Sequence, residues 1–231
     1  MTLNTSTEEK RKLFHSLVFP VFFLILIWTV KIAEITLHLD LSQLGIYPLH
    51  PKGLIGIITA PLVHANFNHL INNSIPLFFL SWGLFYFYNK IAYNIFFLIY
   101  FMTGLWVWFG ARIAYHIGAS GLVYGLGSFL FFSGIIRRNI NLLAISLLVA
   151  FFYGSMVWGI FPYKPDISWE SHLYGGIAGL ILSVYYRKEG PAATKKNWDE
   201  EEELSDENKY WEINDEPGTN LSEEKDEENL K

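Results

Sequence analysis

Hydrophobic residues dominate long stretches of the chain between residues 13 and 187, and short polar segments separate them. A helix needs about 20 apolar residues to cross the hydrocarbon core of a bilayer, and several of these stretches approach that length. The pattern therefore predicts an all-α membrane protein with six spanning helices. They are expected over Leu13–Leu37, Phe67–Tyr88, Ala92–Ala111, Gly121–Ile136, Ile140–Phe161 and His172–Tyr186.

The connection between the first two predicted spans, His38 to Asn66, is long and is itself apolar. It contains three prolines and several glycines, yet it also carries the run Leu54-Ile55-Gly56-Ile57-Ile58. Solvated linkers are poor in such residues. We therefore expect a structured segment that lies in the membrane interface and contains short helices.

Composition and charge divide the chain into three parts. The 231 residues are 52% hydrophobic and 17% aromatic, and there is no cysteine to form disulfides or a reactive thiolate. Residues 1–187 carry 11 Lys and Arg against 6 Asp and Glu, whereas residues 188–231 carry 6 against 16. We expect a cytoplasmic segment over 1–12, a membrane domain over 13–187 and an acidic, disordered cytoplasmic tail over 188–231.

Basic residues predict the orientation of the bundle. If the N-terminus is cytoplasmic, ten Lys and Arg residues flank the inner ends of the spans and three lie on the outer side. Lys and Arg are more frequent in cytoplasmic loops of membrane proteins. Both termini are therefore expected in the cytoplasm. The three outer residues are Lys52, Arg112 and Lys164.

Polar residues occur at one common depth in three of the predicted spans. The second, fourth and sixth spans all run from the outer to the inner side. Asn73, Ser120 and His172 precede the basic residue at the inner end of their spans by 17, 17 and 15 residues. At about 1.5 Å per residue, each lies about 23–26 Å above that residue, just inside a hydrocarbon core of about 30 Å. His69 lies one turn further out, on the same face as Asn73.

Polar groups at this depth either hold helices together or form a site, because the bilayer penalises polar groups that face lipid. A serine in Gly118-Ala119-Ser120-Gly121 can serve in helix packing alone. A serine, histidines and an asparagine also supply a nucleophile, a base and oxyanion donors for acyl transfer. Small residues four apart would let the fourth and sixth spans approach closely and bring His172 to Ser120. These are Gly121, Gly125, Gly175 and Gly179.

Other site chemistries find less support in the sequence. A zinc protease is disfavoured because the chain has no HExxH motif. His64 and His69 are five residues apart and would point to different sides of a helix. A small transporter remains an alternative, although no repeats or broken helices are evident. We expect Glu170 to be a solvated residue near the start of a helix and His116 to be a plain loop histidine.

The chain resembles the rhomboid intramembrane serine proteases in three motifs, which occur in the order typical of that family. The first motif is His64-x4-His69-x3-Asn73, and the second is Gly118-Ala119-Ser120-Gly121 with Tyr124 three residues later. The third is His172-x2-Gly175-x3-Gly179. The resemblance covers about residues 13–187 and implies a six-helix bundle with a long first loop.

The resemblance also implies a role for each matching residue. Ser120 would be the nucleophile and His172 the general base. The side chains of His69 and Asn73, together with the backbone N–H of Ser120, would hold the oxyanion. Tyr124 would stack against His172, and the remaining matched positions would support the site. These supporting positions are His64, Gly118, Gly121, Gly175 and Gly179.

The function implied by the resemblance is that of a serine endopeptidase which cleaves membrane proteins in or beside their transmembrane segments. The substrates would be membrane proteins with locally unstable helices and a small residue before the cleaved bond, in the lipid bilayer of the plasma (inner) membrane. No cofactor, metal or nucleic-acid partner is expected. A rhomboid-like pseudoprotease that binds helices without cleavage is the second alternative.

Hydrolysis requires water inside the membrane domain. We therefore expect a polar cavity that opens to the outer face. It would be lined by His64, His69, Asn73, Ser120 and His172.

Overall fold

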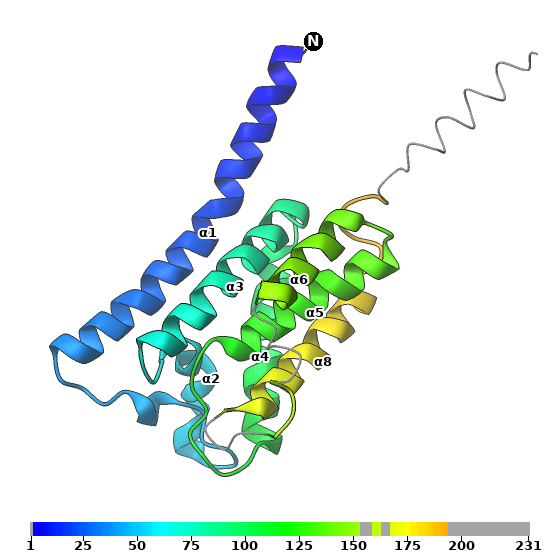
Figure 1. Cartoon of the computed structure of the whole chain (residues 1–231). Coiled ribbons are helices and arrows are strands. Elements are labelled where there is room, and N and C mark those ends of the chain that lie inside the picture. Colours follow the sequence, from blue (N-terminus) through cyan, green and yellow to red (C-terminus); the bar gives the residue numbers. More distant parts are fainter. Residues whose placement is uncertain (1, 153–158, 163–166, 194–231) are drawn as a thin grey trace, which may run out of the picture. The chain divides into compact units, whose positions relative to one another are not determined.

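The computed structural model describes residues 2–152, 159–162 and 167–193, and these residues are all-helical apart from their connections (Figure 1). This confirms the predicted fold class at the level of secondary structure. The helices are α1 (Thr2–Thr36), η1 (Ser42–Leu44), η2 (Pro51–Leu54), α2 (Gly56–Thr59), η3 (Ala60–Leu62), α3 (Phe67–Phe87), α4 (Ala92–Gly110), α5 (Ser120–Ile136), α6 (Ile140–Phe152) and α8 (Trp169–Tyr185).

Three of the described helices are long and apolar enough to cross a membrane: α1 over Thr7–Thr36, α3 and α4. The apolar helices α5 and α6 are shorter over their described residues. Part of the expected fifth span, residues 153–158, lies outside the described residues. The count of six spans therefore stays a prediction.

Two helices begin earlier than the hydrophobic pattern predicted. The helix α1 begins at Thr2 rather than Leu13, since the polar run before Leu13 is rich in Glu, Lys and Arg, which are good helix formers. The helix α8 begins at Trp169 rather than His172 and has Glu170 in its first turn, where a carboxylate interacts favourably with the helix dipole. Hydrophobicity alone marks the buried part of a helix and misses such polar ends.

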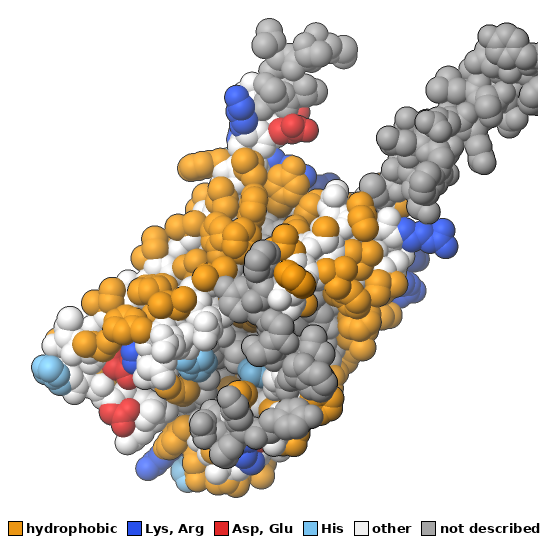
Figure 2. Space-filling model, viewed as in Figure 1, with side chains coloured by type: hydrophobic (Ala, Val, Ile, Leu, Met, Phe, Trp, Pro, Cys, Tyr) orange, Lys and Arg blue, Asp and Glu red, His pale blue; other side chains and the backbone are white. Residues whose placement is uncertain are grey.

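The helix α5 lies at the centre of the bundle, where it contacts α3, α4, α6 and α8 (Figure 1). Its side chains Leu126 and Leu130 are fully buried together with Ile95 and Ile99 of α4. The outside of the bundle is also apolar, and Figure 2 shows hydrophobic side chains over much of the visible face. Phe151, for example, is 82% exposed, as expected for a surface that contacts lipid.

Glycines allow α5 and α8 to touch through their backbones. A Cβ atom added to Gly175 would lie 2.0 Å from the carbonyl oxygen of Gly121. A Cβ added to Gly179 would lie 2.1 Å from the carbonyl oxygen of Gly125. No side chain can occupy these positions while the two helices keep this separation.

The connection between α1 and α3 contains the short helices η1, η2, α2 and η3 and packs against α4. A Cβ added to Gly104 of α4 would lie 3.0 Å from the side chain of Ile57. The hydroxyl of Tyr100 donates a hydrogen bond to the carbonyl of Ile58. The connection also donates and accepts backbone hydrogen bonds with the segment before α5, through the pair Ile46 and His116.

The segment after α8 contacts the end of α5. The guanidinium of Arg137 donates hydrogen bonds to the carbonyls of Arg187, Gly190 and Pro191. The amide of Asn139 donates a hydrogen bond to the carbonyl of Ala192. Most of the predicted acidic tail, residues 194–231, lies outside the described residues.

Candidate active site

Ser120 and His172 meet at the contact between α5 and α8. Ser120 is the first residue of α5 and is half-buried, and His172 lies in the first turn of α8 and is 8% exposed. The hydroxyl of Ser120 lies 2.8 Å from Nε2 of His172. The close backbone contact of the two helices is what lets these short side chains reach each other.

The second ring nitrogen of His172 fixes the tautomer of the imidazole. Nδ1 lies 2.8 Å from the carbonyl oxygen of Gly159, and a carbonyl oxygen can only accept a hydrogen bond. The proton of a neutral imidazole is therefore on Nδ1, and Nε2 is the acceptor for the Ser120 hydroxyl. No carboxylate is evident in the sequence for this orienting role, and in the structure the carbonyl of Gly159 occupies that position.

Tyr124 stacks on the imidazole of His172, with ring centroids 4.1 Å apart and planes at 6°. A Cβ added to Gly159 would lie 2.0 Å from the Tyr124 hydroxyl and 3.0 Å from Nδ1 of His172. Glycine at position 159 therefore lets the backbone come close enough to bind the imidazole. Sequence reasoning missed Gly159, because a backbone carbonyl leaves no signal in residue type.

His69 and Asn73 line the other side of the segment that leads to Ser120. A Cβ added to Gly118 would lie 2.6 Å from Cε1 of His69 and 3.6 Å from Nδ2 of Asn73. Gly118 has a φ of +103°, a backbone conformation that residues other than glycine rarely adopt. Asn73 is 6% exposed and its amide donates a hydrogen bond to the carbonyl of His69 at 3.1 Å.

His64 lies before α3, which begins at Phe67 as predicted, so the helical angle considered between His64 and His69 does not apply. Asn66, with extended backbone, starts the helix by accepting a hydrogen bond from the backbone N–H of His69. The turn before it brings the rings of His64 and His69 to 5.1 Å between centroids. Nε2 of His64 accepts a hydrogen bond from the backbone N–H of Ala119 at 3.4 Å.

His64 is neutral in this position. Burial lowers the pKa of its imidazole to about 3, with smaller effects of the charges of His69 and Lys31. A neutral ring is required here because Nε2 accepts a hydrogen bond from Ala119 and a protonated nitrogen cannot. His64 therefore fixes the backbone one residue before Ser120.

Glu170 is 3% exposed and forms an ion pair with Arg112 at 3.3 Å, so the prediction of a solvated residue was wrong. Arg112 also donates a hydrogen bond to the carbonyl of Ile167 at 2.8 Å. These contacts connect the segment after α4 to the start of α8. The Glu170 carboxylate can be buried because Arg112, 58 residues earlier in the chain, lies next to it in the fold. The sequence alone does not show that these two residues meet.

His116 is 2% exposed rather than a plain loop residue. Nε2 donates a hydrogen bond to the carbonyl of Arg112 at 3.0 Å, so Nδ1 is free to accept from the hydroxyl of Ser168 at 2.5 Å. Burial lowers the pKa of this imidazole, which favours the neutral form. Ser171 in turn lies 2.6 Å from Ser168 through their hydroxyl oxygens. This chain joins the segment before Ser120 to the residue before His172.

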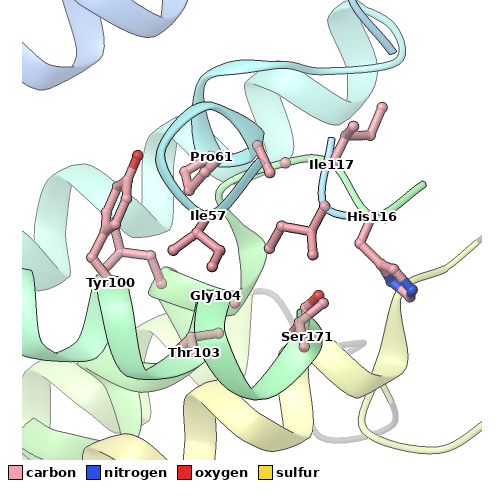
Figure 3. Close-up of a pocket in the computed structure, with 14 residues that line it drawn as sticks. Ile57, Pro61, Tyr100, Thr103, Gly104, His116, Ile117 and Ser171 are labelled. Carbon is pink, nitrogen blue, oxygen red and sulfur yellow. The ribbon is translucent and has the colours of Figure 1, made fainter. Parts of the chain in front are cut away.

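A cavity of about 30 Å³ lies behind the backbone of Gly118 and Gly121, between α4 and the connection from α1 to α3 (Figure 3). Its volume is enough for a single water molecule. The hydroxyl of Thr103, on its wall, is buried and has no hydrogen-bond partner among the described residues. Its labelled lining residues in Figure 3 are Ile57, Pro61, Tyr100, Thr103, Gly104, His116, Ile117 and Ser171.

This cavity differs from the predicted one, which was to be lined by the five polar side chains around Ser120. None of those five lines it. Among the described residues, His64 packs on His69, His69 lies against Gly118, and His172 stacks on Tyr124. The cavity lies next to the backbone of Gly118 and Gly121 and not among the side chains around Ser120.

Relatives of this chain occur in several bacteria. An uncharacterized protein of Mycobacterium tuberculosis is 35% identical over 175 residues, which cover 70% of this chain and 71% of the relative. An uncharacterized protein of Mycobacterium leprae is 31% identical over 176 residues, covering 70% and 67%. A Bacillus subtilis protein named "Putative rhomboid protease YdcA" is 28% identical over 142 residues, covering 55% and 64%.

A family model described as "Rhomboid domain" matches residues 51–189, which is more than half of the chain. The matched region includes α3, α4, α5 and α8, which carry Ser120, His172, His69 and Asn73. Together with the long apolar helices, these comparisons show that the chain is an integral membrane protein of the rhomboid family.

Proposed function

We propose that this protein is an intramembrane serine endopeptidase that uses Ser120 as the nucleophile and His172 as the general base. The observation that carries the proposal is the 2.8 Å contact between the Ser120 hydroxyl and Nε2 of His172, whose tautomer is fixed by Gly159. A nucleophile within hydrogen-bond distance of an oriented base is the arrangement that acyl transfer requires. Family membership supports the same activity.

The acylation step follows from the positions of these groups. Nε2 of His172 accepts the hydroxyl proton as the Ser120 oxygen attacks the carbonyl carbon of the scissile peptide bond. The carbonyl π electrons move onto its oxygen and form an oxyanion. When the tetrahedral intermediate collapses, the C–N bond breaks and Nε2 gives the proton to the leaving amine. The acyl group is then an ester on Ser120.

Deacylation repeats these steps with water. His172 removes a proton from a water molecule as its oxygen attacks the ester carbonyl, and the Ser120 oxygen leaves with the proton that His172 returns. Tyr124 holds the plane of the imidazole through both half-reactions by stacking.

The oxyanion is held on the side of Gly118. The backbone N–H of Ser120, the imidazole of His69 and the amide of Asn73 are the donors of this site, which matches their position beside the segment Gly118–Ser120. Hydrogen-bond donors placed where negative charge develops contribute strongly to catalysis. The positive φ of Gly118 turns the backbone toward the two side chains.

The substrates of this proposal are membrane proteins with locally unstable transmembrane helices and a small residue before the cleaved bond. The protein acts in the plasma (inner) membrane, which its six spans cross. Both of its termini lie in the cytoplasm. Residues 1–12 and 188–231 then lie on the cytoplasmic side. The positive-inside distribution of Lys and Arg supports this orientation.

The test is cleavage by the purified full-length protein in detergent and in liposomes. A panel of single-span proteins is incubated with it, and cut sites are mapped by mass spectrometry. We expect cleavage within or beside a span, covalent labelling of Ser120 by a fluorophosphonate probe, and loss of both in Ser120→Ala and His172→Ala. Ser128→Ala is the matched control, because the Ser128 hydroxyl also joins α5 to α8, through the carbonyl of Gly176. Cleavage by Ser120→Ala at the wild-type rate would reject the dyad.

A further inference from the structure

Lys31 is a buried cation near the end of α1, in a helix whose other side chains are largely apolar and exposed. It is 6% exposed. A buried charge is costly unless it is paired and fully hydrogen-bonded. Neither the motifs nor the predicted dyad uses this residue, so its burial needs a separate explanation.

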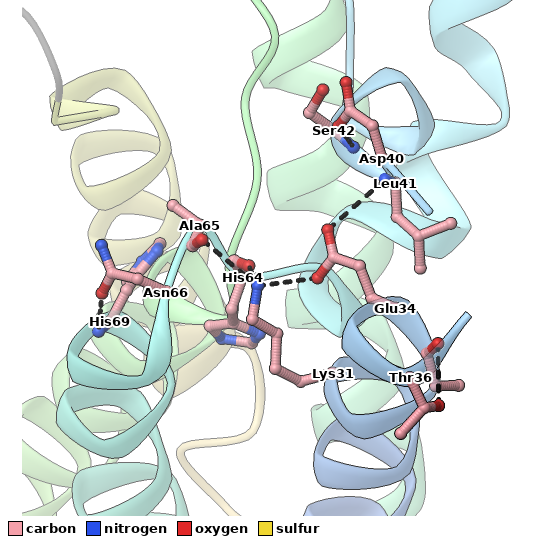
Figure 4. Close-up of polar contacts among 11 residues, drawn as sticks. Lys31, Glu34, Thr36, Asp40, Leu41, Ser42, His64, Ala65, Asn66 and His69 are labelled. Carbon is pink, nitrogen blue, oxygen red and sulfur yellow. Dashed lines mark hydrogen bonds and ion pairs between the residues drawn. The ribbon is translucent and has the colours of Figure 1, made fainter. Parts of the chain in front are cut away.

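The ammonium group of Lys31 uses all three of its donors (Figure 4). Nζ donates to Oε2 of Glu34 at 2.7 Å, to the carbonyl of His64 at 2.8 Å and to the carbonyl of Ala65 at 3.2 Å. The other carboxylate oxygen of Glu34 accepts a hydrogen bond from the backbone N–H of Leu41 at 3.4 Å. The pair therefore connects α1 to a backbone turn that is 33 residues away.

The turn that Lys31 holds is connected to two parts of the candidate active site. Ala65 is followed by Asn66, whose side chain accepts a hydrogen bond from the backbone N–H of His69 and so sets the first turn of α3. The ring of His64 accepts a hydrogen bond from the backbone N–H of Ala119. Lys31 thus holds the backbone turn from which α3 starts. Through the same turn it positions the His64 ring, which binds the backbone of Ala119.

We propose that Lys31, oriented by Glu34, is a positioning residue that keeps the oxyanion side of the site, His69 and the Ala119–Ser120 backbone, in register with the dyad. The proposal rests on the proposed protease function. Charge-assisted hydrogen bonds, such as those to these two successive carbonyls, are shorter and stronger than neutral ones. They hold the turn at residues 64–65, at the end of the long connection from α1.

A role in stability alone predicts a different outcome. Replacing a buried ion pair by apolar side chains of similar size is often neutral for stability. It would still remove both hydrogen bonds to the carbonyls. The double variant K31M/E34M therefore separates the two roles, whereas K31M by itself leaves the Glu34 carboxylate unpaired.

The experiment measures kcat, KM and the melting temperature of the full-length protein with a substrate cleaved by the wild type. For K31M/E34M we expect a melting temperature close to that of the wild type, kcat lower by about 10–100-fold and KM within about threefold. E34Q, which keeps both carbonyl contacts of Lys31, should retain more activity than K31M/E34M. K52M removes an exposed lysine from the connection between α1 and α3, and its kcat, KM and melting temperature should match those of the wild type.

A second measurement tests whether Lys31 acts through the oxyanion site. His69→Ala alone should lower kcat by about 10²–10³-fold. If Lys31 acts partly through His69, adding K31M/E34M to His69→Ala should lower kcat by a clearly smaller factor than K31M/E34M does in the wild type, because coupled residues are not additive. Multiplicative losses, or wild-type kcat in K31M/E34M, would overturn this inference. Undiminished cleavage by Ser120→Ala would instead overturn the proposed function.

Discussion

The carbonyl oxygen of Gly159 accepts a hydrogen bond from Nδ1 of His172 at 2.8 Å. The backbone thereby takes the orienting role that a carboxylate has in a Ser-His-Asp triad. A neutral carbonyl orients the ring but stabilises an imidazolium less than a carboxylate does. The stacked ring of Tyr124 then becomes the second restraint on the imidazole.

Gly159→Ala should impair catalysis more than stability. The added Cβ would lie 2.0 Å from the Tyr124 hydroxyl and 3.0 Å from Nδ1 of His172, so the backbone must withdraw from the imidazole. We expect kcat to fall by about 10–100-fold, measured with any substrate of the wild type. Gly127→Ala is the control, since its Cβ would meet Leu80 at an ordinary 3.6 Å. Equal kcat values for the two variants would contradict the orienting role.

Gly175→Ala should separate α5 from α8 and lower the stability of the protein. The added methyl group would lie 2.0 Å from the carbonyl oxygen of Gly121, which cannot move without bending α5. Overpacking of this kind costs about 1–3 kcal/mol. The neighbouring Gly176→Ala is a matched control, because a Cβ at Gly176 meets nothing within 4 Å. Thermal unfolding in detergent should distinguish the two, and a melting temperature of Gly175→Ala equal to that of Gly176→Ala would disprove the close contact.

Glu170→Ala should destabilise the start of α8 and reduce turnover. The substitution removes the ion pair with the Arg112 guanidinium and the hydrogen bond that the Arg112 backbone N–H donates to Glu170. Loss of a partner from a buried polar contact costs about 1–3 kcal/mol. Glu170 precedes His172 by two residues, so we also expect a lower kcat. Glu189→Ala, which removes an exposed carboxylate after α8, serves as the control in both assays, and a melting temperature of Glu170→Ala within its range would count against the ion pair.

His64 should make the stability of the protein depend on pH. Its folded-state pKa of about 3 lies below the ordinary value of 6.5, so the unfolded chain binds more protons between these values. The stability contributed by the neutral ring is fully present above pH 6.5 and is lost progressively as pH falls toward 3. Lys31 of α1 and His69 of α3 are the charged or titratable groups that face the ring.

The variant His64→Gln isolates this dependence from that of other groups. The glutamine side chain accepts a hydrogen bond from Ala119 but does not titrate. The melting temperature of the wild type should fall more steeply than that of the variant between pH 6.5 and pH 5. Parallel curves for the two proteins would show that the pKa of His64 is the same in the folded and in the unfolded chain, and would contradict this prediction.

The apolar stretches predicted the helices well, because a chain in lipid must satisfy its backbone hydrogen bonds within each segment. The ends of α3, α4 and α5 differ from the predicted ends by at most one residue. The polar starts of α1 and α8 were missed, since they are not part of the apolar surface. The spacing of Gly175 and Gly179 indicated a close helix contact, because only small residues permit one.

The sequence by itself therefore determined most of the helix bounds and the small-residue faces, because these depend on local periodicity and residue size, whereas the common membrane depth of Ser120, His172 and Asn73 stays a prediction. The tertiary structure decided which groups complete the site. The burial of Lys31 and Glu170 and the carbonyl of Gly159 all depend on partners that are distant in the chain. A buried charge is stable in a low-dielectric interior only where such partners come together around it. Only the folded chain brings these partners together.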